Sequence, residues 1–188
     1  MKNRIHEIKL CGKVEFLEEG NALLVKSGDT VIVERGTPRL LVMRCPCGCG
    51  ENLVINLDKR SGPAWRHYVN KRGLSLYPSY WRDTACGSHF ILSNSKIYWC
   101  YSRRESDSVL NWGVSSSIEN VVLTALSDKQ FVEYENLADS LELTPWEVLQ
   151  ACRQLVKLGK ATSIKKSSSE MFKKVSKNKK KGKSRLTR

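Results

Sequence analysis

The stretch Arg44-Cys45-Pro46-Cys47-Gly48-Cys49-Gly50-Glu51 decides what kind of domain the first half of this chain forms. Its three cysteines occupy alternate positions, and alternate side chains of an extended segment face the same side. Glycines on both sides of Cys49 permit the sharp backbone turns that bring several sulfurs to one point. Further along, Cys86-Gly87-Ser88-His89 supplies another thiol and an imidazole three residues later. The two stretches together predict a metal site.

Zinc suits this set of ligands best. Structural zinc takes four ligands in a tetrahedron, usually two from each of two separated segments. We predict Zn²⁺ bound by Cys45, Cys47, Cys49 and Cys86, with His89 as a substitute for one cysteine. The C-x-C-x-C spacing departs from the commoner C-x2-C of zinc ribbons. A Rieske-type iron–sulfur site is the second interpretation, although the first stretch lacks the histidine that such a site needs.

Residues 1–110 are predicted to form a β-rich domain, because apolar and β-branched runs recur between turn signals. The expected strands are 5–16, 30–35, 40–43, 53–57, 65–69, 74–77, 89–92 and 96–101. Ser93-Asn94-Ser95 is a plausible hairpin turn between the last two. Cys11, Cys100 and Cys152 lie in apolar surroundings and are expected in the core.

The pattern changes to helices after a polar linker at 111–117. Helices are expected at 118–126, at 134–141 and after Thr144-Pro145-Trp146-Glu147, where Thr144 and Glu147 form a capping box and Gly159 ends the helix. Short strands at 161–166 and 171–175 follow. Residues 116–176 therefore resemble a winged helix-turn-helix domain. The fold class is α+β: a small zinc-stabilised β-rich domain, then a winged helix, then a disordered basic tail at 177–188.

Charge is distributed unevenly along the chain. The formal net charge is +13, from 32 Lys+Arg and 19 Asp+Glu, and residues 157–188 hold 13 of those basic residues with one acid, Glu170. The body is thus nearly neutral and its C-terminal end is basic, which favours a polyanionic partner, usually nucleic acid. A solubilising tail is the structural alternative.

The winged helix and tail define a predicted nucleic-acid surface. The third helix of such a domain enters the major groove and the wing contacts the backbone. Gln150, Arg153 and Gln154 could read bases, whereas lysines of the helix end and wing suit phosphates. The predicted contacts are Gln150, Arg153, Gln154, Lys157, Lys165, Lys166, Lys173 and Lys174. Winged helices also serve as protein-docking modules.

A family resemblance covers most of residues 1–105. The string Cys45-Pro-Cys-Gly-Cys-Gly-Glu51, then 75–79 (SLYPS), 86–91 (CGSHFI) and 97–100 (IYWC), resembles a bacterial cysteine-rich family long catalogued as a domain of unknown function. Its members are encoded beside ubiquitin-like proteins and E1-like and E2-like enzymes. The resemblance implies a metal-stabilised β domain, a ubiquitin-like protein or those enzymes as partners, a peptidase or isopeptidase that matures or removes the tag, and a setting in bacterial defence.

A serine peptidase needs a serine within hydrogen-bond reach of a histidine. Ser88 and His89 are adjacent, so on a strand their side chains diverge and they cannot pair with each other. Ser79 with His89, or Ser88 with His67, remain as pairs, and Ser79, Ser88 and His89 are the candidate catalytic residues. Glu51, Asp58 or Asp83 could orient the base. A metallohydrolase using Glu51 is the other enzymatic option.

Two functions from different classes are compatible with the sequence. One is a serine-type hydrolase of ubiquitin-like conjugates, and the other is a non-enzymatic zinc-containing DNA- or RNA-binding adaptor or regulator. The first residues show no apolar stretch of a signal peptide, and no run is long enough to span a membrane. We therefore expect a cytoplasmic protein with no membrane partner, whose cysteines are thiols or metal ligands rather than disulfides.

Overall fold

The computed structural model describes residues 4–100, 113–166 and 169–176. The chain divides into two compact units, residues 1–112 and 113–188. As predicted, helices and strands are mixed and the N-terminal unit is rich in β-strand. The predicted tail at 177–188, residues 101–110 of the predicted first domain and the first two linker residues lie outside the described residues.

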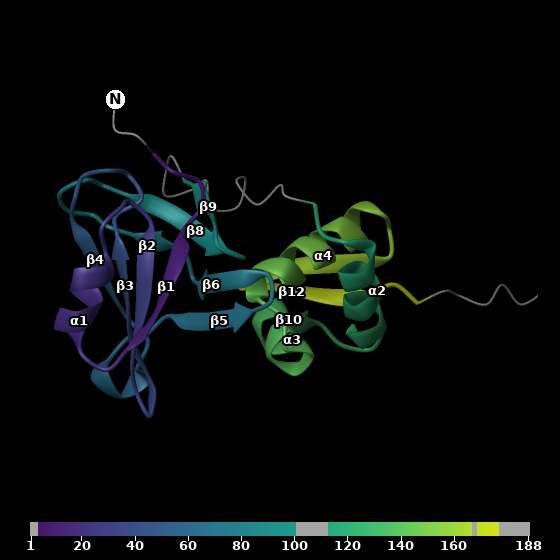
Figure 1. Ribbon diagram of the computed structural model, residues 1–188. Coiled ribbons are helices and arrows are strands. Elements are labelled where there is room, and N and C mark those ends of the chain that lie inside the picture. The colour runs from purple at the N-terminus through teal and green to yellow at the C-terminus, as the bar shows by residue number, and fades with distance from the viewer. Residues whose placement is uncertain (1–3, 101–112, 167–168, 177–188) are drawn as a thin grey trace, which may run out of the picture. The chain divides into compact units, whose positions relative to one another are not determined.

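The described residues of the N-terminal unit form three small sheets, one short α-helix and one 3-10 helix (Figure 1). One sheet has the strand order β1-β2-β3-β4, in which β1 is parallel to β2 and the other pairs are antiparallel. The second is the antiparallel hairpin β5-β6, and the third is the antiparallel sheet β7-β8-β9. The elements are β1 (Lys9–Val14), α1 (Leu17–Leu23), β2 (Asp29–Arg35), β3 (Thr37–Arg44), β4 (Asn52–Asn56), the 3-10 helix η1 (Lys59–Ser61), β5 (Arg66–Asn70), β6 (Gly73–Tyr77), β7 (Tyr80–Trp81), β8 (His89–Ser93) and β9 (Lys96–Trp99).

Alternation along β2 explains why the first sheet is buried on both faces. Val31 and Val33 join a cluster with Leu24 and Val42 on the face that α1 covers. Ile32 points the other way, into the main core, whose members come from all three sheets. A strand covered on both sides needs a continuous apolar run rather than an apolar–polar alternation, and 31–33 supplies one.

Three elements of this unit were not predicted, namely helix α1, the 3-10 helix η1 and the two-residue strand β7. The predicted strand at 5–16 is confirmed only as β1, since the described strand starts at Lys9. α1 is short and contains Gly20, a poor helix former, so its pattern is weak. Gly20 is required by packing, because a Cβ at this position would lie 2.9 Å from Val31 Cγ2. The helix therefore sits against β2 only because this residue has no side chain.

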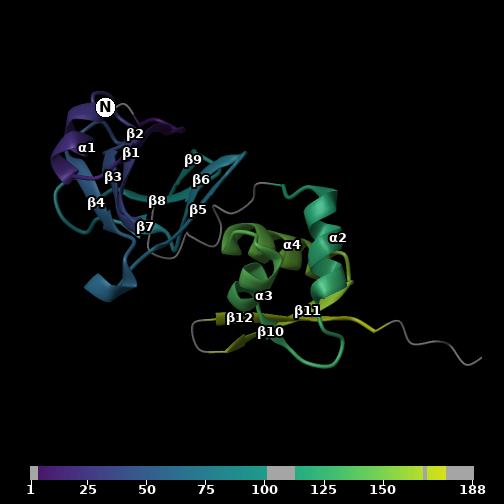
Figure 2. The same ribbon diagram turned by 60° about the horizontal axis from the view of Figure 1, so that its bottom comes forward.

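The described part of the C-terminal unit places three helices on one face of a three-stranded sheet (Figure 2). The sheet has the order β10-β12-β11 and is antiparallel. The elements are α2 (Ser116–Ala125), β10 (Val132–Glu133), α3 (Tyr134–Leu141), α4 (Pro145–Lys157), β11 (Ala161–Lys166) and β12 (Ser169–Lys174). This order is compatible with a winged helix-turn-helix, which stays a prediction.

The predicted capping box at the start of α4 is confirmed. The Glu147 backbone N–H donates to Thr144 Oγ1 at 3.3 Å, and the Thr144 N–H donates to the Glu147 carboxylate at 3.2 Å. Past the other end of the helix, Gly159 takes the left-handed conformation that closes helices, with φ +66°. Leu158, the apolar C-cap residue of this helix, is 49% exposed rather than buried.

Candidate metal centre and serine–histidine pair

The four predicted cysteines converge at the edge of the main core. The sulfurs of Cys45, Cys47, Cys49 and Cys86 all lie within 4.8 Å of one another. Cys45 Sγ is 3.4 Å from Cys47 Sγ and 3.7 Å from Cys86 Sγ. In a tetrahedron with zinc–sulfur bonds of about 2.3 Å, the sulfurs lie about 3.8 Å apart. The cluster therefore has the size of a four-thiolate metal site, and its residues fit a metal ion.

The backbone around the cluster shows why the glycines stand where they do. Cys45 follows β3 directly, and its N–H donates to the Glu51 carbonyl at 2.8 Å, closing the loop 45–51. Within the loop, Gly48 and Gly50 have φ of +79° and +84°, the region where a side chain is strained. These two turns aim three alternate sulfurs inward. Cys86 lies in a second loop, which connects β7 to β8.

Ser88 belongs to this cluster. Its hydroxyl lies 3.1 Å from Cys86 Sγ and 3.5 Å from Cys45 Sγ, and the residue is 2% exposed. Burial works to raise the pKa of the Cys86 thiol, but hydrogen bonds with Ser88, Cys45 and Cys47 together outweigh burial and bring that pKa to about 6. The thiolate is the form that binds a metal. Ser88 thus favours the ligand form of Cys86.

His89 lies outside the four-cysteine group and contacts Ser79 instead. Ser79 stands between β6 and β7, and His89 is the first residue of β8, which pairs with β7. His89 Nε2 is 3.3 Å from Ser79 Oγ. Both residues are half-buried, so the pair is accessible from solvent while burial lowers the pKa of the imidazole. This arrangement suits a histidine that accepts the proton of a serine hydroxyl.

Two tryptophans contact the pair, and no motif in the sequence predicted these contacts. The Trp65 indole N–H donates to the Ser79 carbonyl at 3.5 Å. The Trp81 ring lies against the His89 ring, with centroids 6.2 Å apart. Trp65 also begins a chain of ring contacts through Tyr80 and Phe90 into the core. Trp65 therefore connects Ser79 to the core, and Trp81 covers the His89 ring.

The other predicted arrangements are not seen among the described residues. Ser88 is buried against the cysteine sulfurs and does not lie beside His67. Burial lowers the pKa of His67, and the charges of Glu34 and Lys13 have smaller effects on it. Of the acids expected to orient the base, Asp58 is bound by arginines instead. Glu51 faces Arg82 at 3.9 Å, and no contact joins Asp83 to His89. The described pair is a serine–histidine dyad without a carboxylate.

The predicted base-reading face of α4 is only partly exposed. Gln150 is 9% exposed and belongs to the buried residues, so its prediction as an exposed contact is wrong. The Arg153 guanidinium is engaged by Glu170 of β12, with N–H to carboxylate distances of 2.8 and 3.1 Å. Gln154 is half-buried. The lysines divide into exposed Lys157, Lys165 and Lys166 and half-buried Lys173 and Lys174.

Comparison with known protein families matches the unit that carries these sites. Residues 16–100 match the family described as bacterial ubiquitination-like system serine protease (BubE). Over these residues the chain is similar to that family. The match confirms the predicted link to a family of ubiquitin-like conjugation systems, and it contains both the cysteine cluster and the Ser79–His89 pair. No curated protein and no solved structure is detectably similar to the chain.

The match ends at residue 100 and leaves the C-terminal unit outside it. Among the described helices, none combines the length and the apolar character that a membrane span requires.

Proposed function

We propose that the N-terminal unit is a serine peptidase or isopeptidase that processes or removes a bacterial ubiquitin-like protein. The observation that carries the proposal is the 3.3 Å contact between Ser79 Oγ and His89 Nε2 inside the residues that match a serine-protease family. The pair brings the β6–β7 turn, which carries Ser79, into contact with the start of β8, which carries His89.

The chemistry follows from the pair. Neutral His89 takes the proton of Ser79 while Oγ attacks the carbonyl carbon of the scissile amide or isopeptide bond. The protonated imidazole then gives that proton to the leaving amine, which departs as the acyl-enzyme forms. Water, deprotonated by His89, attacks the ester and releases the new carboxylate and the serine hydroxyl. Ser79 and His89 therefore act as nucleophile and as alternating base and acid.

The cysteines take a structural part in this proposal. A zinc ion bound by Cys45, Cys47, Cys49 and Cys86 would supply a closed cross-link between the loop after β3 and the loop before β8. The second loop contains Cys86 and runs directly into His89. The chain's own residues, Ser88 among them, orient the ligands. Chemistry at the scissile bond stays with Ser79 and His89.

Labelling with a fluorophosphonate probe tests the proposal without requiring the natural substrate. The wild-type chain is expected to become covalently labelled at Ser79, as mapped by peptide mass spectrometry. Ser79→Ala and His89→Ala should both lose labelling and cleavage of a co-encoded ubiquitin-like precursor, with zinc content and circular dichroism unchanged. Undiminished cleavage by Ser79→Ala together with loss of cleavage in Glu51→Gln would assign the reaction to a metal centre instead.

We further propose that the C-terminal unit binds the backbone of nucleic acid through its wing. Lys165 and Lys166 are exposed on β11, and Lys157 and Lys160 are exposed at the end of α4. Because Gln150 is buried and Arg153 is paired with Glu170, the contact would be to phosphates rather than to base edges. Titration of duplex DNA of several sequences at rising salt tests this: affinity should fall steeply with salt and vary little with sequence. Absence of binding at low salt excludes it.

A further inference from the structure

A surface groove of about 720 Å³ lies in the N-terminal unit, apart from the cysteines. Its floor is apolar and comes from Leu17 of α1, Val33 of β2 and Leu40 of β3. Arg35 and Arg39 line it as well, and Asn56 and Pro63 form part of its wall. The volume is in the range of ligand sites, which combine an apolar lining with a few polar groups that fix orientation.

The two arginines are placed by the turn of the β2–β3 hairpin. The register between these strands shifts so that Val33 pairs with Leu40 but Glu34 pairs with Pro38, which leaves Arg39 unpaired in the ladder. A bulge of this kind redirects a side chain and is common beside functional sites. The Arg39 guanidinium thereby reaches Asp58, with which it forms an ion pair.

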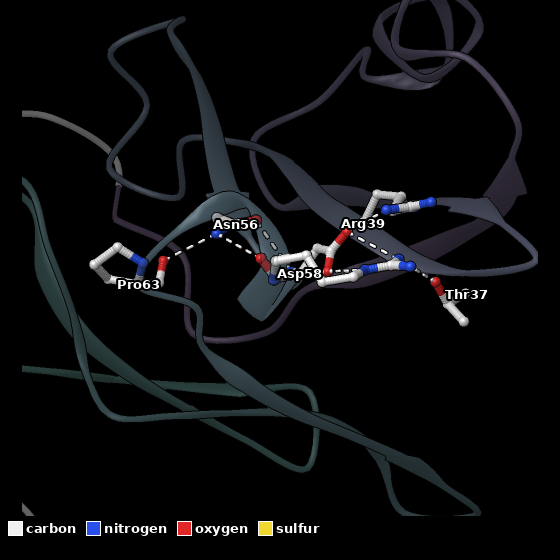
Figure 3. Close-up of polar contacts among 6 residues, drawn as sticks. Thr37, Arg39, Asn56, Asp58 and Pro63 are labelled. Atoms are coloured by element: carbon white, nitrogen blue, oxygen red, sulfur yellow. Dashed lines mark hydrogen bonds and ion pairs between the residues drawn. The ribbon is translucent and has the colours of Figure 1, made fainter.

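The groove carries more positive than negative charge. Asp58 is 7% exposed, and its carboxylate accepts hydrogen bonds from Arg39 and Arg60 (Figure 3). The Arg60 Nε–H donates to Asp58 Oδ1 at 2.8 Å. Arg60 also donates to the Thr37 hydroxyl at 3.1 Å. Arg35 donates its Nε to the Glu15 carbonyl and stacks on the Phe16 ring, and no carboxylate among the described residues pairs with it. Arg35 and Arg39 thus line the groove with two guanidinium groups, its lining residues include no carboxylate, and donors remain for a further anion.

The groove wall connects to the proposed nucleophile through one residue. The Trp65 backbone N–H donates to the Asn56 carbonyl at 2.9 Å, and its indole N–H donates to the Ser79 carbonyl. Trp65 therefore links the groove wall to the segment that carries Ser79, and this link makes the groove our candidate site for a segment that flanks the scissile bond.

We propose that this groove binds an extended peptide segment of the substrate in which an acidic side chain stands next to an apolar one. The apolar side chain covers Leu17, Val33 and Leu40, and the carboxylate takes the remaining donors of Arg35 and Arg39. A guanidinium presents paired donors that match a carboxylate, whereas an ammonium offers a single point charge. The assignment of the peptide to a substrate rests on the proposed peptidase function, but its binding does not depend on catalysis.

Fluorescence anisotropy of short labelled peptides tests the groove with the full-length Ser79→Ala chain, which cannot cleave them. The acidic probe is Gly-Glu-Leu-Glu-Leu-Gly, and the matched basic probe is Gly-Lys-Leu-Lys-Leu-Gly. We expect saturable binding of the acidic peptide alone. Arg35→Gln should weaken it about tenfold or more, the loss typical of hydrogen bonds to a charged group. Arg39→Lys, which retains a cation for Asp58 but not the planar fork, should also weaken it.

The control is Lys26→Gln, which removes one exposed positive charge away from the groove lining and should leave binding unchanged. Equal binding of the acidic peptide to Arg35→Gln, Arg39→Lys and the parent, or no saturable binding below about 1 mM, overturns the proposal. Fluorophosphonate labelling of Ser79 in the wild-type chain is scored separately. Loss of labelling would refute the peptidase function while peptide binding still decides the groove.

Discussion

Ser88→Ala and Ser79→Ala form a pair of identical chemical changes with opposite expected results. Both remove one hydroxyl from a serine in the segment 79–88, but Ser88 contacts sulfurs and Ser79 contacts the imidazole. We expect Ser88→Ala to weaken metal binding and spare labelling by fluorophosphonate at saturating zinc. Ser79→Ala should do the reverse.

The size of the Ser88 effect follows from its contacts. The hydroxyl has one proton, so it donates to one sulfur at a time, and Cys86 at 3.1 Å is the nearer acceptor. Loss of one hydrogen bond to a charged group costs about 1.5–3 kcal/mol, which corresponds to a roughly 10- to 150-fold weaker zinc affinity. This agrees with the 10- to 100-fold losses that removal of such orienting groups typically causes.

Competition with a chromophoric zinc chelator measures the affinity, and gel fluorescence after probe treatment measures labelling. Circular dichroism in excess zinc verifies that both variants are folded. Loss of labelling in zinc-saturated Ser88→Ala would show that Ser88, not Ser79, is the nucleophile. A change in zinc affinity in Ser79→Ala would show that the dyad and the cysteines are not separate sites.

Four other perturbations have defined outcomes. Burial lowers the pKa of His89 from 6.5, so the acid limb of kcat/KM against pH should lie below pH 6.5, and a limb above that value contradicts His89 as the base. Cys86→Ser should release the metal, as measured by atomic absorption. It should also lower the unfolding free energy by about 2–3 kcal/mol and therefore Tm by about 10 °C or more. Stoichiometric zinc retained by this variant would show that Cys86 is not a ligand. Hydrogen bonds from Arg60 hold the pKa of Asp58 well below its usual range, so ionised Asp58 stabilises the fold above the unfolded pKa of about 3.9, and this stabilisation is lost as pH falls through the folded pKa. In urea unfolding, the loss of unfolding free energy caused by Asp58→Asn should therefore shrink below about pH 4. A loss that grows there refutes the ion pair. Lys165→Gln with Lys166→Gln should reduce the slope of log K against log salt for duplex DNA by about two, whereas an unchanged slope removes the wing from the contact.

Local signals in the sequence predicted much of the metal cluster and of the C-terminal unit. Gly48 and Gly50 predict turns that only a glycine makes without strain, and Thr144 with Glu147 predicts the start of a helix. Both kinds of signal span only a few residues. Pairing between distant segments has no such signal. The parallel partner of β1, and the burial of Gln150 by neighbouring helices, depend on contacts that a periodic pattern does not encode.

The candidate pair illustrates the same limit. Alternation along a strand predicts that Ser88 and His89 diverge, and they do. It does not say which of them faces the cysteines. That choice is made by the register of β7 on β8, in which Trp81 lies opposite His89 and Tyr80 opposite buried Phe90. Phe90 enters the core, and its neighbour His89 must then point toward Ser79.

This geometry joins the metal centre and the dyad through the chain itself. Cys86, Ser88 and His89 fall within four consecutive residues, and the Arg82 N–H donates to the Ser88 carbonyl at 2.8 Å, which holds the loop closed at the base of β7 and β8. Loss of the metal would free Cys86, and the loop that ends at His89 would then lose its anchor. A structural zinc ion would then control cleavage without contacting substrate, because the 3.3 Å contact of His89 with Ser79 depends on where β8 begins.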